Sequence, residues 1–281
     1  MSIREDARLS TLDGLLDELH LTKVGLLGRL LGRDPKPESN LSADLFAVVD
    51  ALEGSPSLRR AVSDPGTPEE ARKNLVHGLL DGKVSDAAAT LVAEGAAMRW
   101  AGGRTFAAAL ERQAVRAELL QADADGQLDE TEDELFRFAR LVQSSPELRD
   151  ALGDRSVALT HRQTLVEQLL TGKVSDSTVV LARRAVAARE RTFAHSIESY
   201  VTLAAQQKNR VVATVRVAKP LSDEQLVRLR KALAAQVGRE VTVQVIIDEQ
   251  VLGGVRVELG NEVVEGTVAG RLADARRLFA P

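Results

Sequence analysis

Two stretches of this chain repeat each other at a constant offset of 90 residues. The segment LLDGKVSD at residues 79–86 returns as LLTGKVSD at 169–176, and SPSLRRA returns at the same offset as SPELRDA. Residues 45–92 and 135–182 align without a gap and share 19 identities over 48 positions, far above the handful expected by chance. Internal repeats are interpreted before single motifs, because each copy predicts one structural module.

Both copies have the pattern of a bundle of short helices. The segments ADLFAVVDALEGS and DELFRFARLVQSS have apolar residues at helical spacing. A Ser-Pro pair then starts the next helix, and a Gly-Lys pair ends a later one. We therefore predict a mainly α-helical chain with two tandem duplicated bundles, at 1–115 and 116–208, and a cap at Ser39 or Ser42. The stretch 104–123 contains no breaker, so one long helix is expected to close the first bundle and open the second.

Downstream of Lys208 the spacing of apolar residues changes from the helical period of 3.6 to the strand period of 2. The segments RVVATVRVA and EVTVQVIID alternate as strands. The segment GGVRVELGNEVVEGT predicts a β-hairpin that turns at Gly260 and Asn261, and GRLADARRLFA predicts a last helix. Residues 209–281 are therefore expected to form a small C-terminal α/β domain.

A strongly signalled helix lies between these two strands. In LSDEQLVRLRKALAAQVG, Ser222 and Gln225 have the spacing of a capping box, and a glycine follows the last apolar residue. The side chains spaced to form its buried stripe are Leu226, Leu229, Leu233 and Val237.

The composition excludes several classes of function. The chain of 281 residues has a net charge of −4 without a long run of either sign, which argues against a nucleic-acid footprint. It contains no cysteine, which excludes disulfides, thiol nucleophiles and zinc–thiolate sites. No apolar run approaches the roughly 20 residues that span a bilayer, and the start MSIREDARLS is too polar for a signal peptide. We therefore expect a cytoplasmic protein that only a partner would hold at a membrane.

Two patterns resemble binding motifs, but each has a simpler structural interpretation. In residues 121–132 acidic side chains occupy most of the positions that bind calcium in an EF-hand loop. Gln121, however, stands at the first of these positions, where a carboxylate is expected. An acidic turn between helices, with Gly126 as its cap, is the favoured interpretation. The Gly-Lys pairs lack the glycine spacing and the following Ser or Thr of a phosphate loop, so they are expected to be helix ends.

The remaining candidates for chemistry are isolated residues. The four histidines are scattered and are expected at the surface; they are His20, His77, His161 and His195. Trp100, the single tryptophan, is expected in the core of its bundle rather than at a partner contact. We predict no catalytic residue, no metal site and no cofactor.

The C-terminal region carries a family resemblance. The PLSDEQL helix, the strand that ends in Asp248, and VLGGVRVELGNEVVEGTVAGRL resemble the delta subunit of rotary ATP synthases, whose mitochondrial relative is the oligomycin sensitivity-conferring protein. The matching residues are Pro220, Leu221, Asp248, Leu252, Gly253, Gly254, Val255, Gly266, Arg271 and Leu272. The second helical copy is similar to that family's six-helix bundle. The first copy resembles the longer actinobacterial delta chains with a duplicated bundle, and we expect the unfused form, without the b-type stalk helix that some lineages fuse to it.

The resemblance implies a non-catalytic stator subunit. Its helical bundle would receive N-terminal helices of alpha subunits, with the second bundle as the expected alpha-binding copy, and its C-terminal domain would receive the ends of b-type stalk subunits. The matching residues would serve structure or stalk contact, and Val255, Val257 and Leu278 are expected to give this domain an apolar stalk-facing surface. The chain would be a peripheral protein at the cytoplasmic face of the cell membrane, held by the ATP synthase complex, with no ATPase activity of its own.

Two other functions are compatible with the pattern. A general helical adaptor would use the repeats as docking grooves and differs from a stator only in its partners. An RNA-binding module is disfavoured by the acidic pI of about 5.7, by the low aromatic content of 3% and by the missing basic stripe.

Overall fold

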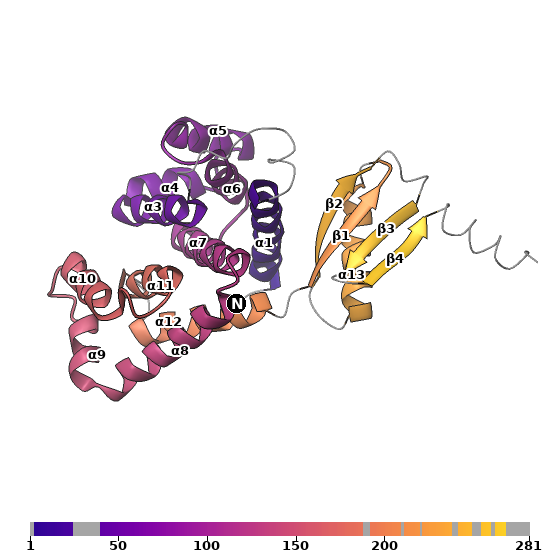
Figure 1. Cartoon of the computed structure of the whole chain (residues 1–281). Coiled ribbons are helices and arrows are strands. Elements are labelled where there is room, and N and C mark those ends of the chain that lie inside the picture. The colour runs from indigo at the N-terminus through magenta and orange to yellow at the C-terminus, as the bar shows by residue number, and fades with distance from the viewer. Residues whose placement is uncertain are drawn as a thin grey trace, which may run out of the picture. The chain divides into compact units, whose positions relative to one another are not determined.

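The computed structural model shows two compact units, a helical unit over 1–208 and an α/β unit over 209–281 (Figure 1). The residues that the structure describes are 3–24, 40–187, 192–208, 211–219, 221–237, 241–248, 254–259 and 262–267. Within them the mainly α-helical class with a small sheet near the C-terminus, predicted from the sequence, is confirmed.

The helices of the helical unit recur in the same order. They are α1 (Ile3–Val24), α3 (Leu41–Gly54), α4 (Pro56–Ser63), α5 (Glu69–Leu80), α6 (Asp86–Ala97), α7 (Gly103–Ala124), α8 (Leu128–Ser144), α9 (Pro146–Gly153), α10 (Leu159–Leu170), α11 (Asp176–Ala187) and α12 (Phe193–Lys208). The starts of α4, α5, α6 and α7 are separated from those of α9, α10, α11 and α12 by the offset found in the sequence. The five helices from α3 to α7 therefore correspond to the five from α8 to α12.

Equivalent helices start and end with the same local interactions. Ser55 and Ser145 each accept a backbone N–H hydrogen bond at 3.3 Å at the starts of α4 and α9. Gly82 and Gly172 follow the ends of α5 and α10 with φ of 72° and 75°, a conformation that glycine adopts without steric cost. The expected helix ends at the Gly-Lys pairs are confirmed.

The cap of α3 is Asn40, so the prediction of Ser39 or Ser42 was wrong. The Asn40 side chain accepts hydrogen bonds from the backbone N–H of Ser42 at 3.1 Å and of Ala43 at 3.4 Å. Ser42 is the second residue of the helix, two positions past the cap, and its hydroxyl binds Glu118 instead. Asn and Ser are almost equally good caps, so sequence preference alone does not choose between them.

The helix α7 is shared between the two series. It is one continuous helix from Gly103 to Ala124, as the absence of a breaker predicted. It packs against α1, α3, α4 and α6 on one side and against α8, α11 and α12 on the other (Figure 1). We call α1 and α3 to α6 the first helical group, and α8 to α12 the second helical group. Buried residues of both groups join into one hydrophobic core, so α7 fixes one group to the other.

Gly95 marks a close approach between α6 and α7. A Cβ added at Gly95 would lie 2.9 Å from Cε2 of Phe106 and 3.7 Å from Cδ2 of Leu12, and both of these side chains are fully buried. We expect Gly95→Ala to lower the free energy of unfolding by about 1–3 kcal/mol. Gly78→Ala in α5, where nothing lies within 4 Å, is the control and should raise it by up to about 1 kcal/mol. Urea unfolding followed by circular dichroism measures both; equal effects would contradict this packing.

The α/β unit is built on a four-stranded sheet in the order β2-β1-β3-β4. Its elements are β1 (Val211–Val217), α13 (Asp223–Val237), β2 (Val241–Ile247), β3 (Gly254–Leu259) and β4 (Glu262–Thr267). β1 and β2 are parallel and are connected through α13, whereas β3 pairs antiparallel with both β1 and β4. Leu259 pairs with Glu262, so the hairpin turns between them, as predicted. The predicted last helix lies outside the described residues.

One apolar face of the sheet makes the core of this unit. Ala213, Val215 and Val217 alternate along β1 and are buried on that face together with Leu233 of α13. The predicted capping box is present at the start of α13: Gln225 Oε1 accepts from Ser222 N at 2.9 Å, and Ser222 Oγ accepts from Gln225 N at 3.4 Å. In the predicted stripe Leu233 is buried and Leu226 and Leu229 are half-buried, while the side chain of Val237 lies outside the described residues.

Candidate functional site

The described residues of the C-terminal motif gather at one end of the sheet. Asp248 directly follows β2, and its N–H donates to the carbonyl of Val217 at the end of β1, over 2.9 Å. Val217 also pairs with Val255 in β3, and Val255 pairs with Gly266 in β4. Asp248, Val255 and Gly266, which are far apart in the sequence, are therefore brought together by the strand register.

Some of the other motif residues also lie in the described part of this unit. The Asp248 carboxylate lies 3.8 Å from the guanidinium of Arg216. Leu221 packs against the core, and Gly254 begins β3 opposite Thr267. The motif residues that lie outside the described part of the chain are Pro220, Leu252, Gly253, Arg271 and Leu272.

The apolar stalk-facing surface predicted on this unit was wrong for Val257, while Val255 is half-buried. Val257 is buried in the core with 5% of its surface exposed, and Val255 packs against that core. Leu278 lies outside the described residues. The alternation along a strand tells which residues share a face, but only the position of α13 decides which face is buried. The large apolar side chains exposed in the described part of this unit are Val227 and Ile247.

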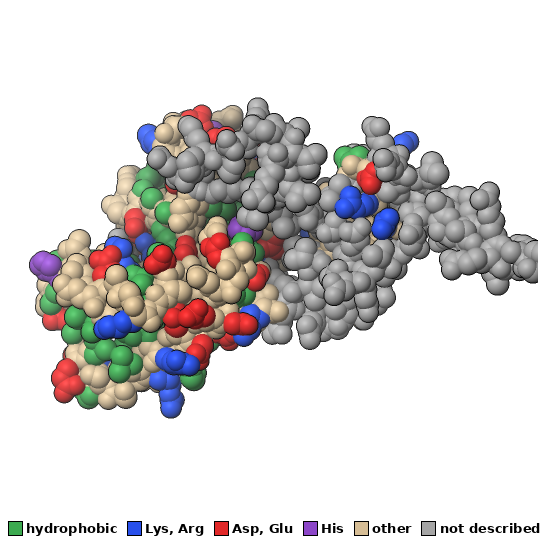
Figure 2. All heavy atoms as spheres, viewed as in Figure 1, with side chains coloured by type: hydrophobic (Ala, Val, Ile, Leu, Met, Phe, Trp, Pro, Cys, Tyr) green, Lys and Arg blue, Asp and Glu red, His purple; other side chains and the backbone are tan. Residues whose placement is uncertain are grey.

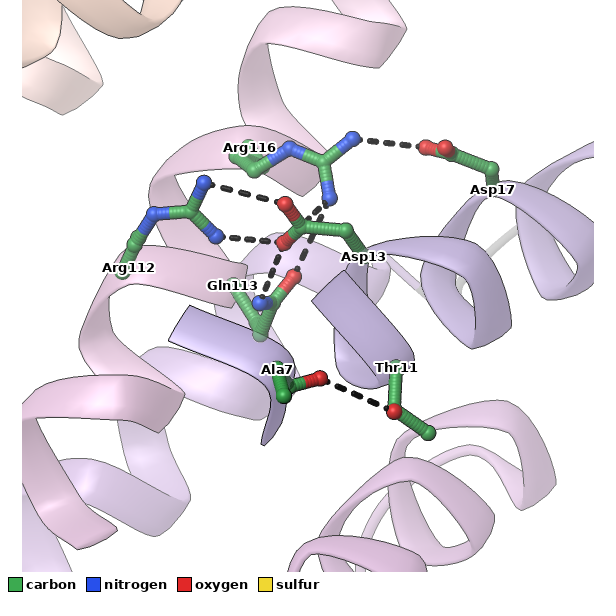
Figure 3. A network of polar contacts seen from close by, with 7 residues as sticks. All are labelled: Ala7, Thr11, Asp13, Asp17, Arg112, Gln113 and Arg116. Atoms are coloured by element: carbon green, nitrogen blue, oxygen red, sulfur yellow. Dashed lines mark hydrogen bonds and ion pairs between the residues drawn. The ribbon is translucent and has the colours of Figure 1, made fainter. Parts of the chain in front are cut away.

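A network of charged side chains joins α1 to α7 (Figure 3). Asp13 on α1 forms a two-pronged ion pair with Arg112, accepts from Gln113 Nε2 at 2.8 Å and pairs with Arg116 at 2.8 Å. Arg116, which is 4% exposed, also pairs with Asp17 at 2.7 Å. Burial alone would raise the pKa of Asp13, but the hydrogen bonds from Arg112 and Gln113 and the charges of the two arginines outweigh it, so this pKa lies below its usual range.

The lowered pKa of Asp13 makes a stability contribution that depends on pH. A carboxyl group whose pKa is lower in the folded state stabilises the fold above its unfolded pKa, near 4, and loses that effect as the pH falls through the folded value. We expect Asp13→Asn to lower the free energy of unfolding by about 1–3 kcal/mol at pH 7, and the difference from wild type to shrink below about pH 4. Asp6→Asn on the exposed face of α1 is the control. Urea unfolding at pH 7 and 3.5 tests this; a difference independent of pH would refute it.

A second network joins α7 to α11, α12 and α3. The Arg184 guanidinium binds both carboxylate oxygens of Glu111, with Nε at 2.7 and 2.9 Å, and pairs with Asp50 at 2.7 Å. It also lies 4.8 Å from the ring centroid of Phe46, close enough for a cation–π contact. The Tyr200 hydroxyl donates to Glu111 at 3.3 Å. Burial raises the pKa of Tyr200, and the charge of Glu111 adds to this effect, so the phenol stays protonated.

Glu118 on α7 is a buried acid that bridges the two helical groups. It is 5% exposed and accepts hydrogen bonds from the hydroxyls of Ser42 on α3 and Ser177 on α11, the latter at 2.8 Å. Arg116, Glu118 and Arg184 were not identified as important from the sequence. For Arg116 and Glu118 the available signal was that they are charges in the middle of an uninterrupted helix that lies between two bundles.

The acidic segment 121–132 contains the end of α7, the start of α8 and the turn between them. Gly126 has a φ of 72° and its N–H donates to Asp123 O at 3.0 Å, as expected for a helix end. Two of its acids, Asp129 and Glu132, pair with Lys208 at 2.8 and 2.7 Å. Among the described residues no group of three or more His, Asp or Glu side chains is placed to hold a metal ion.

The Gly-Lys pairs have a structural role. Lys83 Nζ donates to the carbonyl of Leu79 at 2.8 Å, and Lys173 Nζ to that of Leu169 at 2.9 Å. Each lysine therefore satisfies a carbonyl at the end of its own helix, where a positive charge is favourable.

Trp100 and the histidines can now be placed. Trp100 lies in the core, as predicted, with its ring 5.8 Å from that of Phe106 and its Nε1 donating to Gly95 O at 2.8 Å. His20 is buried with 8% exposed, so its predicted surface position was wrong, because it lies on the packed side of α1. The other three histidines are exposed, as predicted. No helix in the described part of the chain has the length and hydropathy needed to cross a membrane.

Comparison with known proteins places the chain in one family. The family model of the ATP synthase delta (OSCP) subunit matches residues 112–279. The ATP synthase subunit delta of Beutenbergia cavernae is 43% identical over 86% of this chain and 89% of its own length. That of Parafrankia sp. is 38% identical over 96% of both chains, and that of Streptomyces avermitilis is 42% identical over 85% and 88%. The chain therefore belongs to the ATP synthase delta (OSCP) subunit family, the non-catalytic peripheral-stalk subunits of F-type ATP synthase.

Proposed function

We propose that this chain links the catalytic alpha/beta head to the b-type stalk. In this proposal the second helical group receives an N-terminal helix of an alpha subunit, and the α/β unit receives the C-terminal ends of b subunits. The observation that carries the proposal is the extent of the family match, which covers both the second helical group and the α/β unit. The complex would then hold the chain at the cytoplasmic face of the membrane as a peripheral protein.

A stator subunit must keep its partners in place while the rotor turns. This requires binding on the order of −12 kcal/mol, spread over several contacts of helical size. It also requires a stiff subunit, because a hinge would absorb torque. The continuous helix α7 supports that stiffness, as do the buried Glu118 and the half-buried Arg184 along the joint of the two groups.

The two helical groups are proposed to derive from one duplicated bundle. Their equivalent helices, caps and helix ends support this origin. In this division α7 contains the boundary between a first bundle, 1–115, and a second bundle, 116–208, and the stalk-binding domain is 209–281. The motif residues from Pro220 to Leu272 would shape the end of the sheet that the stalk meets.

Neither a general adaptor nor an RNA-binding module gains support. Figure 2 shows acidic and basic side chains interspersed over the visible face of the helical unit. Binding to nucleic-acid phosphates uses a continuous basic surface instead.

The proposal is tested with the purified full-length chain as bait. We expect it to recover alpha and b subunits from membranes that lack their own copy of this subunit. The fragment 103–281 should still bind an alpha N-terminal peptide; it begins at 103 because a cut at 116 would fall inside α7. Recovery of neither subunit would overturn the proposal, and peptide binding to 1–124 alone would reverse the assignment of the two groups.

A further inference from the structure

Three helices meet where the first helical group adjoins the second. α3 belongs to the first group, α11 belongs to the second, and α7 is shared. Two sets of polar contacts cross between these helices, and each set takes one side chain from every helix. We call them the ionic contact, formed by Asp50, Glu111 and Arg184, and the hydroxyl contact, formed by Ser42, Glu118 and Ser177.

The ionic contact is centred on Arg184 of α11. Its guanidinium pairs with Asp50 of α3 at 2.7 Å and binds both carboxylate oxygens of Glu111 of α7. It also lies 4.8 Å from the ring centroid of Phe46 on α3, which is 8% exposed. The repeat equivalent of Phe46 is Phe136 on α8, which is 53% exposed. Docking of α3 on α11 therefore covers a ring that stays uncovered at the equivalent position.

The hydroxyl contact lies two helical turns away. Glu118 accepts hydrogen bonds from the hydroxyls of Ser42 on α3 and Ser177 on α11. Glu118 follows Glu111 by seven residues on α7, and Ser177 precedes Arg184 by seven on α11. On both helices the two contacts therefore share one face at a separation of about 10 Å. A single contact would act as a pivot, whereas two contacts at this separation resist rotation of α3 against α11.

The contact residues differ between the two copies of the repeat. At the equivalent positions of α8 and α6 stand Glu132 for Ser42, Arg140 for Asp50, Ala87 for Ser177 and Glu94 for Arg184. A contact inside each bundle is repeated instead. In the first group the Asp44 carboxylate accepts from the backbone N–H of Ser85 at 2.9 Å, and in the second Glu134 accepts from that of Ser175 at 3.0 Å. The ionic and hydroxyl contacts are therefore specific to the joint and not part of the packing that the two bundles share.

We propose that the ionic and hydroxyl contacts fix the orientation of the first helical group about α7. This deepens the proposed function and rests on it for its role in the enzyme, because it names the residues that give the stator its stiffness. A shared helix sets the distance between two groups but can bend, as long helices commonly do. Polar contacts buried in a joint contribute modestly to stability, but they are satisfied in one relative position only, since another would leave Glu118 with fewer partners in the interior.

The test measures the distance between the two groups in the purified full-length chain. The chain contains no cysteine, so spin labels are attached at Asn74→Cys on α5 and Thr164→Cys on α10, which are exposed and equivalent in the repeat. Pulsed electron paramagnetic resonance should give one narrow distance distribution for the otherwise wild-type chain. The double variant Ser42→Ala/Asp50→Ala removes the α3 side of both contacts and should roughly double the width of that distribution. Each single variant should broaden it less, because one contact remains.

The matched control is Glu132→Ala/Arg140→Ala, the same change at the equivalent positions of α8. Glu132 pairs with Lys208 inside the second group, and Arg140 is exposed, so the distribution should keep its width. Circular dichroism checks that each variant keeps its helices.

Two results would overturn the inference. A folded double variant with the wild-type distribution would mean that α7 alone holds the orientation. Loss of helical structure in the double variant would mean that Ser42 and Asp50 stabilise the bundle itself and not its orientation. Neither result decides the proposed function, which fails only if the wild-type chain recovers neither alpha nor b subunits.

Discussion

Deletion of residues 268–281 is expected to separate the catalytic head from the membrane sector. The family match extends to residue 279, so this segment belongs to the part that we propose for stalk contact. Proton-coupled ATP synthesis should fall to background, because torque has no fixed frame to act against. ATP hydrolysis by the released head should continue, because the active sites lie in other subunits.

The position of the cut keeps this experiment interpretable. Residues 262–267 form β4 and pair with β3, so a longer deletion from 265 would remove part of the sheet as well. Two quantities are measured on the same membranes: the rate of ATP synthesis driven by an imposed proton gradient, and the ATP hydrolysis activity that is released into the wash. The control is Val227→Ala, an exposed apolar position on α13, which leaves the segment in place. Membranes with the deletion that still make ATP at the normal rate would show that this segment does not hold the stalk.

Arg72→Ala is expected to have the largest effect on stability among single substitutions in the helical unit. The Arg72 side chain is 1% exposed and donates to four backbone carbonyls. These belong to Ala96 at 2.7 Å, Ala97 at 2.5 Å, Asp64 at 2.8 Å and Thr67 at 2.9 Å. The two alanines are the last residues of α6, whose carbonyls have no partner within the helix. Alanine at 72 would leave these buried acceptors unsatisfied and open a cavity.

The free energy of unfolding should fall by about 3–5 kcal/mol, with a drop in Tm of roughly 10 °C. The repeat supplies the matched control, Arg162→Ala. Arg162 is half-buried and donates only to Leu152 O at 3.2 Å and Val157 O at 3.3 Å among the described residues, so its loss should be about 1 kcal/mol. Thermal melting of the two variants by circular dichroism compares them. Equal losses would mean that the carbonyl contacts of Arg72 do not stabilise the first helical group.

Helix starts, helix ends and turns could be predicted from the sequence, because they depend on residues that are close together along the chain. Glycines 82, 126 and 172, the Ser-Pro starts and the capping box of Ser222 each act within four or five residues, and each is found where it was predicted. The continuous helix α7 follows from the same rules, since nothing in 104–123 interrupts it.

Which residues are buried and which are exposed could not be predicted from the sequence, because burial depends on partners that are distant in the sequence. Phe46 and Phe136 have the same neighbours along the chain, and only the docking of α3 on α11 makes one of them buried. Val257 was assigned to the surface because strand alternation does not tell which face meets α13. Arg116 and Glu118 are charged residues that the amphipathic pattern places outside, yet their partners on α1, α3 and α11 allow their burial.

The most direct test of the proposed stator role is a cryo-EM map of the intact enzyme that contains this chain. We expect one copy on top of the alpha/beta head, with the second helical group in contact with an alpha N-terminal helix and the α/β unit in contact with the b-type stalk. A map in which the α/β unit touches only the head, or in which the b-type stalk reaches the head without this chain, would contradict that role.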